Sequence, residues 1–190
     1  IKVEQSRTEI IEKLRELETA IKGGKLEDLE WGKLHSLVFG QHLYSPLIYL
    51  KEDYVQMRPV TLEESEKNFV MALRSFYDSN KPFFTGKELY LLRNQSRGRG
   101  IGFFEDGGFY PDFILWLLID GQQYITFVDP HGLGHSGMAD PKLHFSTKIK
   151  ELEADLGDES ITLNSFILSP TPFEHLLWGA KKSELEARNV

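Results

Sequence analysis

The sequence has no cysteine and no long apolar segment. The absence of cysteine excludes disulfides and thiolate zinc sites and is typical of a reducing compartment, so we expect a cytoplasmic protein. The longest apolar run, Phe113–Ile119, is far shorter than the ~20 residues that span a bilayer, so we expect no membrane partner. No positively charged and then apolar leader opens the chain, and Ile1 in place of methionine suggests a piece of a longer protein.

Positive charge is also scarce. The 22 lysines and arginines are outnumbered by 29 aspartates and glutamates, which gives a formal net charge of −7. Such a surface does not attract nucleic acid as a whole, although a local basic patch is compatible with it. The chain is instead rich in aromatic side chains, with 13 Phe, 7 Tyr and 3 Trp, and this composition excludes disorder and supports one well-formed core.

Residues 1–80 are predicted to form a mainly helical annex. Two pairs, Ser6 with Glu9 and Thr61 with Glu64, have the spacing of a capping box, which satisfies backbone N–H groups at the start of a helix. The expected elements are a helix from Ser6 to Gly23, a second helical pattern over 26–38, an extended stretch over 45–60 and a helix from Thr61 to about Asn80.

Residues 81–190 are predicted to form an α/β domain. The expected elements are a short helix Gly86–Asn94 opened by a Thr85–Glu88 capping box, strands Gly100–Glu105, Phe109–Ile119 and Gln122–Val128, a helix from Asp140-Pro141 to Gly157, a strand Ile161–Leu168 and a helix from Thr171 to about Arg188. This αβββαβα order predicts a three-strand meander, a crossover helix and a fourth strand in one mixed sheet, covered by helices.

The register of the two central strands follows from their turn. Asp120-Gly121 is the strongest two-residue hairpin signal in the chain and sets Ile119 opposite Gln122. Counting outward along both strands then sets Asp112 opposite Asp129 on one face, with Cβ atoms ~5 Å apart, where like charges repel each other. A divalent cation between them would remove the conflict. Apolar residues fill both faces, as in a sheet covered on both sides: Ile114, Trp116, Leu118, Ile125 and Phe127 beside the carboxylates, and Phe113, Leu115, Leu117, Thr126 and Val128 opposite.

These residues resemble a known nuclease family. Pro111-Asp112, followed at a distance by Asp129-Pro130-His131, is similar to the PD-(D/E)XK nuclease motif, with His131 in place of its lysine. The wider segments Gly86–Asn94, Phe109–Phe113 and Asp129–Leu133 resemble the C-terminal nuclease region of DEAD/DEAH helicases related to the Res subunit of type III restriction enzymes. The resemblance covers about 60–171 and does not extend to the first 60 residues. It implies a restriction-endonuclease-like αβββαβ fold.

The resemblance also implies an activity and its site. The activity is that of a Mg²⁺- or Mn²⁺-dependent endodeoxyribonuclease, with DNA as substrate and a parent helicase/ATPase module as partner. Asp112, Asp129 and the carbonyl of Pro130 would supply oxygen ligands, which Mg²⁺ prefers. His131 would act as a base or a hydrogen-bond donor where the family has a fixed cation. Glu88 is a candidate fourth catalytic residue because the family often has an acid on the helix before its first strand.

Three further groups of residues leave alternatives open. Arg93, Arg97 and Arg99 are candidates for phosphate contacts with DNA, or they belong to a solvated loop. Glu105 would join the face of Asp112 only if Gly107-Gly108 formed the preceding hairpin loop, setting it opposite Tyr110. A zinc site made of His131 and His135 with Asp129 or Asp140 is a weaker hypothesis, because the glycine-rich segment between the histidines is not expected to form a helix that would hold both on one face.

Two functions compete with the nuclease. The first is a nuclease-fold module that has lost cleavage along with its lysine and now binds DNA or docks on its parent helicase. The second is a metal hydrolase that acts on something other than nucleic acid.

Overall fold

The computed structural model describes most of the chain from residue 62 onward and short segments before it. Backbone and side chains are described for 62–95, 100–103, 109–130, 140–176 and 181–190, and for Leu133, Gly137 and Gly179. Within residues 1–61 the description covers the backbone of 2–3, 29–31, 34–37, 47–50 and 55–56, and the residues 8, 11–12, 15–16 and 18–19.

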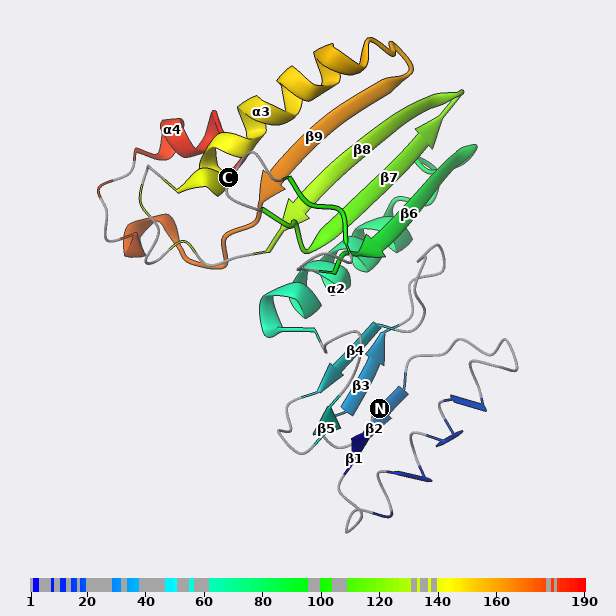
Figure 1. Cartoon of the computed structure of the whole chain (residues 1–190). Coiled ribbons are helices and arrows are strands. Elements are labelled where there is room, and N and C mark those ends of the chain that lie inside the picture. The colour runs from blue at the N-terminus through cyan, green and yellow to red at the C-terminus, as the bar shows by residue number, and fades with distance from the viewer. Residues whose placement is uncertain are drawn as a thin grey trace.

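A four-stranded mixed sheet forms the centre of the fold (Figure 1). Its strands lie in the order β6 (Lys87–Arg93), β7 (Phe113–Ile119), β8 (Gln122–Asp129) and β9 (Ile161–Ile167). The first three pair antiparallel in sequence, and β9 pairs parallel to β8. The predicted α/β class, with a parallel fourth strand after the crossover helix, is therefore confirmed. The predicted meander is wrong in its first strand, because β6 takes that place, and of the described residues 100–103 only Phe103 pairs, in an isolated bridge to Phe109.

The β7–β8 hairpin has the predicted register. Ile119 pairs with Gln122, and the ladder continues to Phe113 opposite Val128. Asp120 and Gly121 have φ values of +49° and +84°, the left-handed pair that a tight hairpin turn requires. The two carboxylates therefore end the hairpin together.

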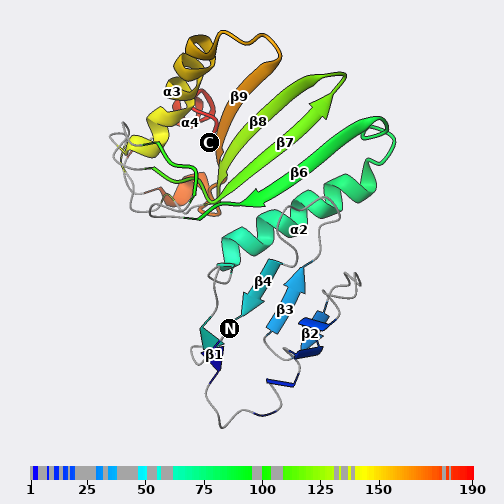
Figure 2. The same ribbon diagram turned by 45° about the vertical axis from the view of Figure 1, so that its right-hand side comes forward.

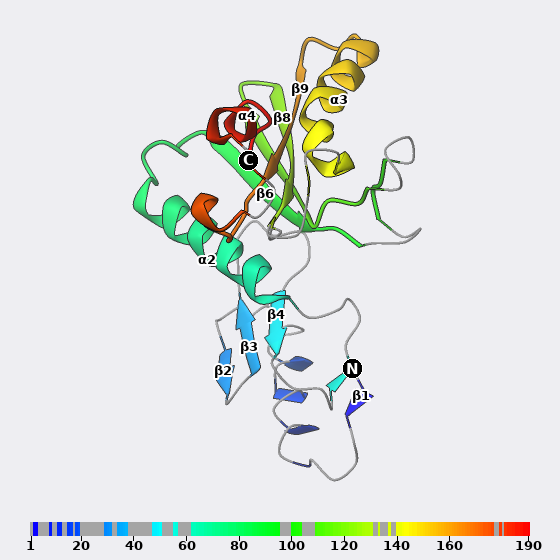
Figure 3. The ribbon, with the colours of Figure 1, turned by 90° about the vertical axis from the view of Figure 1, so that its left-hand side faces the viewer.

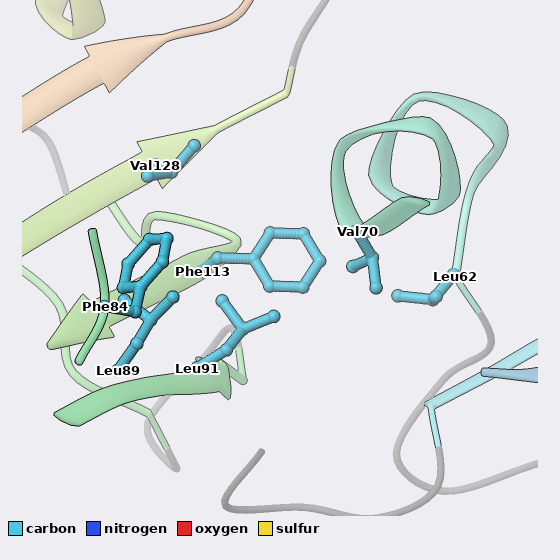
Figure 4. Close-up of a cluster of buried hydrophobic side chains, with 7 residues drawn as sticks. All are labelled: Leu62, Val70, Phe84, Leu89, Leu91, Phe113 and Val128. Carbon is cyan, nitrogen blue, oxygen red and sulfur yellow. The ribbon is translucent and has the colours of Figure 1, made fainter. Parts of the chain in front are cut away.

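Two helices cover opposite faces of the sheet, as Figures 2 and 3 show. Helix α2 (Glu64–Ser79) packs on one face and α3 (Pro141–Leu156) on the other. Phe113 and Val128 point toward α2, and Figure 4 shows the Phe113 ring between the strands and Val70. Ile114, Trp116, Ile125 and Phe127 pack instead with Phe145 and Ile149 of α3. The two predicted apolar faces are thus confirmed.

Helix α3 begins and ends as its sequence predicts. The side chain of Asp140 accepts a hydrogen bond from the Lys142 N–H at 3.0 Å, and Pro141 occupies the first turn. Gly157 closes the helix at φ +61°. As the crossover between two parallel strands, α3 runs back along the sheet, so its first turn lies at the end where β8 finishes.

The predicted helix Gly86–Asn94 is wrong, because 87–93 form strand β6. Leu89 and Leu91 alternate with more exposed neighbours, which is the period of a strand, and all seven residues pair with β7. A chain of turns from Asn80 ends at Gly86, whose φ of +74° redirects the backbone. The helix that precedes the first strand is α2, which starts after Glu63 rather than Thr61.

The N-terminal and C-terminal expectations need correction as well. The second predicted helix falls on β2 (Leu29–Trp31) and β3 (Leu34–Leu37). Strand β3 pairs with β2 on one side and with β4 (Leu47–Leu50) on the other in a small antiparallel sheet. Strand β1 (Lys2–Val3) pairs with β5 (Val55–Gln56). The predicted last helix is divided into a 3₁₀ turn, η1 (Phe173–His175), and α4 (Lys182–Glu186). Helical backbone at residues 8, 11–12, 15–16 and 18–19 agrees with the first predicted helix.

The expected boundary at residue 80 divides a packed core. Leu62 and Val70 lie in one buried cluster with Leu89, Leu91 and Phe113. Helix α2 therefore belongs with the sheet, and the annex is confined to the residues before it. In the part of the chain that is described, no helix has the length and apolar composition to cross a membrane.

Candidate functional site

Two carboxylates meet at the open end of the β7–β8 hairpin. Asp112 directly precedes β7, and Asp129 is the last residue of β8, one step beyond the Phe113–Val128 pair. Asp129 is buried, with 2% of its surface exposed, and Asp112 is half-buried. The hairpin therefore brings together the two acids that the register predicts.

The environment of Asp112 favours its protonated form. Burial is the largest cause and raises the pKa of Asp112 to about 7, assisted by the negative charges of Asp129 and Glu66. A protonated Asp112 also donates a hydrogen bond to Asp129, which raises the pKa further, whereas the nearby Lys142 ammonium lowers it. Asp112 is therefore protonated in about half of the molecules near pH 7 when no other cation is bound.

Lys142 is the positive charge that faces this pair. Its Nζ lies 2.7 Å from Oδ2 of Asp129, and 71% of the side-chain surface is covered by the fold, since 29% is exposed. Lys142 stands in the first turn of α3, which returns to the end of β8 after the chain leaves Asp129. It also approaches the Phe109 ring, with 5.6 Å between Nζ and the ring centre.

The other oxygen of Asp129 has no such partner. Oδ1 is buried and has no hydrogen-bond partner among the described residues, apart from a proton on Asp112. A buried carboxylate oxygen in this state is costly unless it binds a cation or a donor. The pair offers carboxylate oxygens of the kind that divalent cations bind, and a proton on Asp112 is the alternative to such a cation.

A second buried ion pair lies next to the carboxylates. One guanidinium nitrogen of Arg93, at the end of β6, is 2.9 Å from both Glu66 oxygens, and Glu66 also accepts the Glu63 N–H at 2.5 Å. Glu66 is 5% exposed, and the Arg93 side chain 13%. Arg93, which we expected to contact DNA, is thus directed toward α2.

Glu88 is not brought to the carboxylates. It is exposed on β6 opposite Leu118, toward the far end of the sheet, and its carboxylate accepts a hydrogen bond from the hydroxyl of Tyr90. The acid on the helix before the first strand whose charge acts on Asp112 is Glu66 of α2. Among the described residues, no group of three or more His, Asp or Glu side chains is arranged to hold a metal.

Several predicted residues lie outside the described part of the chain. They are His131, His135, Arg97, Arg99 and Glu105. Pro130 is described and buried. Phe103 bridges Phe109, whereas the register that sets Glu105 opposite Tyr110 would set Phe103 opposite Asp112. Asp140, offered as a zinc ligand, accepts a backbone hydrogen bond at the start of α3.

The sequence analysis missed Lys142 and Glu66. Each reaches the site from a helix, 13 residues after Asp129 and 27 residues before Arg93 respectively. The only available signal was the start of the crossover helix at Asp140-Pro141, which fixes where the first turn of α3 must lie.

A pocket of about 520 Å³ lies behind Pro130, on the α2 side of the sheet. Its walls are mainly apolar and come from α2, the end of β9 and the C-terminal segment: Phe69, Ile167, Leu168, Phe173, Leu185 and others. None of Asp112, Asp129 and Lys142 lines it. The cavity therefore adjoins the site through Pro130 and not through the two carboxylates.

Comparison with known proteins gives no relative. The chain matches no protein-family model, no curated protein and no solved structure.

Proposed function

We propose that this domain hydrolyses phosphodiester bonds of DNA with a divalent cation, Mg²⁺ or Mn²⁺, held by Asp112 and Asp129. The observation that carries the proposal is the buried carboxylate pair in which Asp129 Oδ1 has no hydrogen-bond partner among the described residues except a proton on Asp112. Proteins bind these hard cations through carboxylate oxygens and leave several water ligands in place. Two carboxylates, with the expected Pro130 carbonyl, suit such a site.

The order of elements supports the same proposal. From α2 onward the chain runs α2, β6, β7, β8, α3, β9, which is the αβββαβ order that the sequence resemblance implies. Pro111-Asp112 precedes the second strand, and Asp129 ends the third. We therefore propose a restriction-endonuclease-like fold for 62–190, working as part of a helicase-type protein.

The chain's own residues divide the remaining tasks. The cation, when bound, would neutralise charge on the phosphate and lower the pKa of an attacking water. Lys142 supplies a fixed ammonium beside Asp129, the role that the family gives to a lysine two residues after the second acid. His131 stands in that sequence position and is the candidate for orienting water. Lys142 would therefore supply the positive charge that is lost where His131 replaces the family's lysine.

Cleavage of DNA tests the proposal. Wild type, with Mn²⁺ or Mg²⁺, should cut plasmid or single-stranded DNA, and a chelator should stop the reaction. Asp112→Asn should abolish cleavage, and Lys142→Met should slow it by about 10²-fold or more, because a charge aimed at the reaction is lost. Lys148→Met, which removes an exposed lysine from the same helix, is the matched control. Cleavage that survives both Asp112→Asn and the chelator would refute the proposal.

One observation favours a second function, a module that binds DNA or docks on its parent helicase without cutting. Lys142 and a proton on Asp112 together neutralise the pair without any metal. If wild type does not cut and His131→Lys does, the domain is a silenced nuclease. If neither cuts, the binding module is the better account.

A further inference from the structure

The geometry points to Asn94 as the positioning residue that holds Asp112 against Asp129. Asn94 directly follows β6 and lies beside the start of β7, where Asp112 must turn its side chain toward a carboxylate that repels it. The inference rests on the metal site proposed above and gives a role to Asn94, the last residue of the segment Gly86–Asn94, to which the sequence analysis assigned none.

Asn94 fixes the backbone on both sides of the Pro111–Asp112 bond. Its own N–H donates to the Asp112 carbonyl at 2.7 Å. Its side-chain Nδ2 donates to the Pro111 carbonyl at 2.9 Å. The backbone bond continues the β6–β7 register by one pair beyond Arg93 and Phe113, and the side-chain bond adds a donor to Pro111, which has no N–H with which to extend the ladder.

The same side chain also binds the segment that follows. Nδ2 donates to the Ile101 carbonyl at 2.7 Å, and Oδ1 accepts the Ile101 N–H at 2.9 Å. Both amide hydrogens and the amide oxygen of Asn94 are therefore engaged. The orientation of the amide is determined, because the reversed one would set a donor against the Ile101 N–H.

Two glycines make room for this arrangement. A Cβ at Gly100 would lie 2.4 Å from Oδ1 of Asn94 and 1.8 Å from the Gln95 carbonyl oxygen. A Cβ at Gly102 would lie 2.3 Å from the Tyr110 ring. Glycine at positions 100 and 102 therefore allows this segment to pack against Asn94 and Tyr110.

The hydrogen bonds of Asn94 hold the backbone at Asp112 in place before a cation binds. Residues that orient a metal ligand through hydrogen bonds change metal affinity by about 10–100-fold when they are removed. Without the Asn94 side chain, the Pro111 carbonyl loses its donor and the segment at Ile101 is no longer tied to β6. Asp112 then turns more readily away from Asp129, which repels it.

Mn²⁺ affinity, followed by calorimetric titration, tests the inference. Asn94→Ala should weaken Mn²⁺ binding by about 10–100-fold. Asn80→Ala is the matched control, since Asn80 also donates its side-chain amide to a backbone carbonyl, that of Phe76, but at the end of α2. The control should lose comparable stability and keep the wild-type affinity. If Asn94→Ala does not fold, Asn94→Ser, whose shorter side chain cannot reach both Ile101 and Pro111, replaces it.

The titrations distinguish failure of the Asn94 positioning role from failure of the proposed metal site. If wild type binds Mn²⁺ and the folded Asn94 variant binds it equally well, or if Asn80→Ala weakens binding as much, the positioning role is refuted and the metal site stands. If wild type itself binds no Mn²⁺, the proposed metal site fails and the positioning role fails with it.

Discussion

At the scale of single residues, the site is an electrostatic balance around one buried carboxylate. Asp129 is held by Lys142 through Oδ2, its Oδ1 has no hydrogen-bond partner among the described residues, and Asp112 lies close to the same carboxylate. Arg93 and Glu66 neutralise each other beside this pair. Removing Lys142 or Arg93 leaves a buried carboxylate, Asp129 or Glu66, without its partner, which costs far more than losing a surface ion pair.

The raised pKa of Asp112 predicts a dependence of stability on pH. The unfolded chain releases this proton near pH 3.8, whereas the folded protein keeps it up to about pH 7. The folded state therefore binds more protons between these values, and its free energy of unfolding should fall as the pH rises from about 4 to about 7. Asp112→Asn should remove this decline. Urea unfolding at several pH values measures it, and equal slopes in both proteins would contradict the assignment.

Lys142→Met should destabilise the metal-free protein. The change leaves the Asp129 carboxylate buried without its partner, and losing one member of a buried pair costs about 3–5 kcal/mol, toward the lower end here because Lys142 is 29% exposed. Lys148→Met should cost about 1 kcal/mol or less, because the Lys148–Glu151 pair is on the surface. Urea unfolding without metal measures both variants. A similar small loss in the two would mean that Asp129 does not depend on Lys142.

At the scale of helices and strands, the sequence predicts those features that neighbouring residues determine. The β7–β8 hairpin was predictable because the register follows from two turn residues with left-handed backbone. The boundaries of α3 were predictable because Asp140, Pro141 and Gly157 are local signals. Strand β6 was not, since Thr85 and Glu88 imitate a helix start and only pairing with β7 overrides them. Lys142 and Glu66 reach the site through tertiary packing, which no local pattern encodes.

The hairpin turn offers a direct check on the element that sets the carboxylate register. Gly121→Ala should destabilise the protein by about 1 kcal/mol, because an L side chain at φ +84° is strained although the space around it is open. Gly137→Ala is the matched control, since its surroundings are also open and its φ is not positive. Thermal unfolding compares the two variants. Equal melting temperatures would show that the turn does not need glycine.

At the scale of the whole molecule, the proposed binding to DNA would have to overcome a net charge of −7. Association therefore depends on a local group of positive charges near the carboxylate pair rather than on the general surface. Lys142 lies in that region, and the segment carrying Arg97 and Arg99 begins close to Asn94 in the sequence.

Substitution of arginines distinguishes DNA-binding charges from structural ones. Arg97→Gln and Arg99→Gln should weaken DNA binding and reduce the slope of log affinity against log salt by about one for each phosphate that the protein no longer neutralises. Arg93→Gln should instead lower stability, because it leaves Glu66 buried without its guanidinium. Fluorescence anisotropy across salt concentrations and urea unfolding measure the two effects. An unchanged salt slope in the Arg97 and Arg99 variants would mean that these side chains do not bind phosphate.

The central claim is that Asp112 and Asp129 together bind one divalent cation, and Mn²⁺-dependent thermal stability tests it most directly. A ligand that binds only the folded state stabilises it by about 2.7 kcal/mol at a hundredfold excess over its dissociation constant. Wild type and Asp155→Asn, which changes an exposed acid on α3, should show this saturable stabilisation. Asp112→Asn should show none. An equal Mn²⁺ stabilisation in Asp112→Asn would place the cation elsewhere and contradict the account.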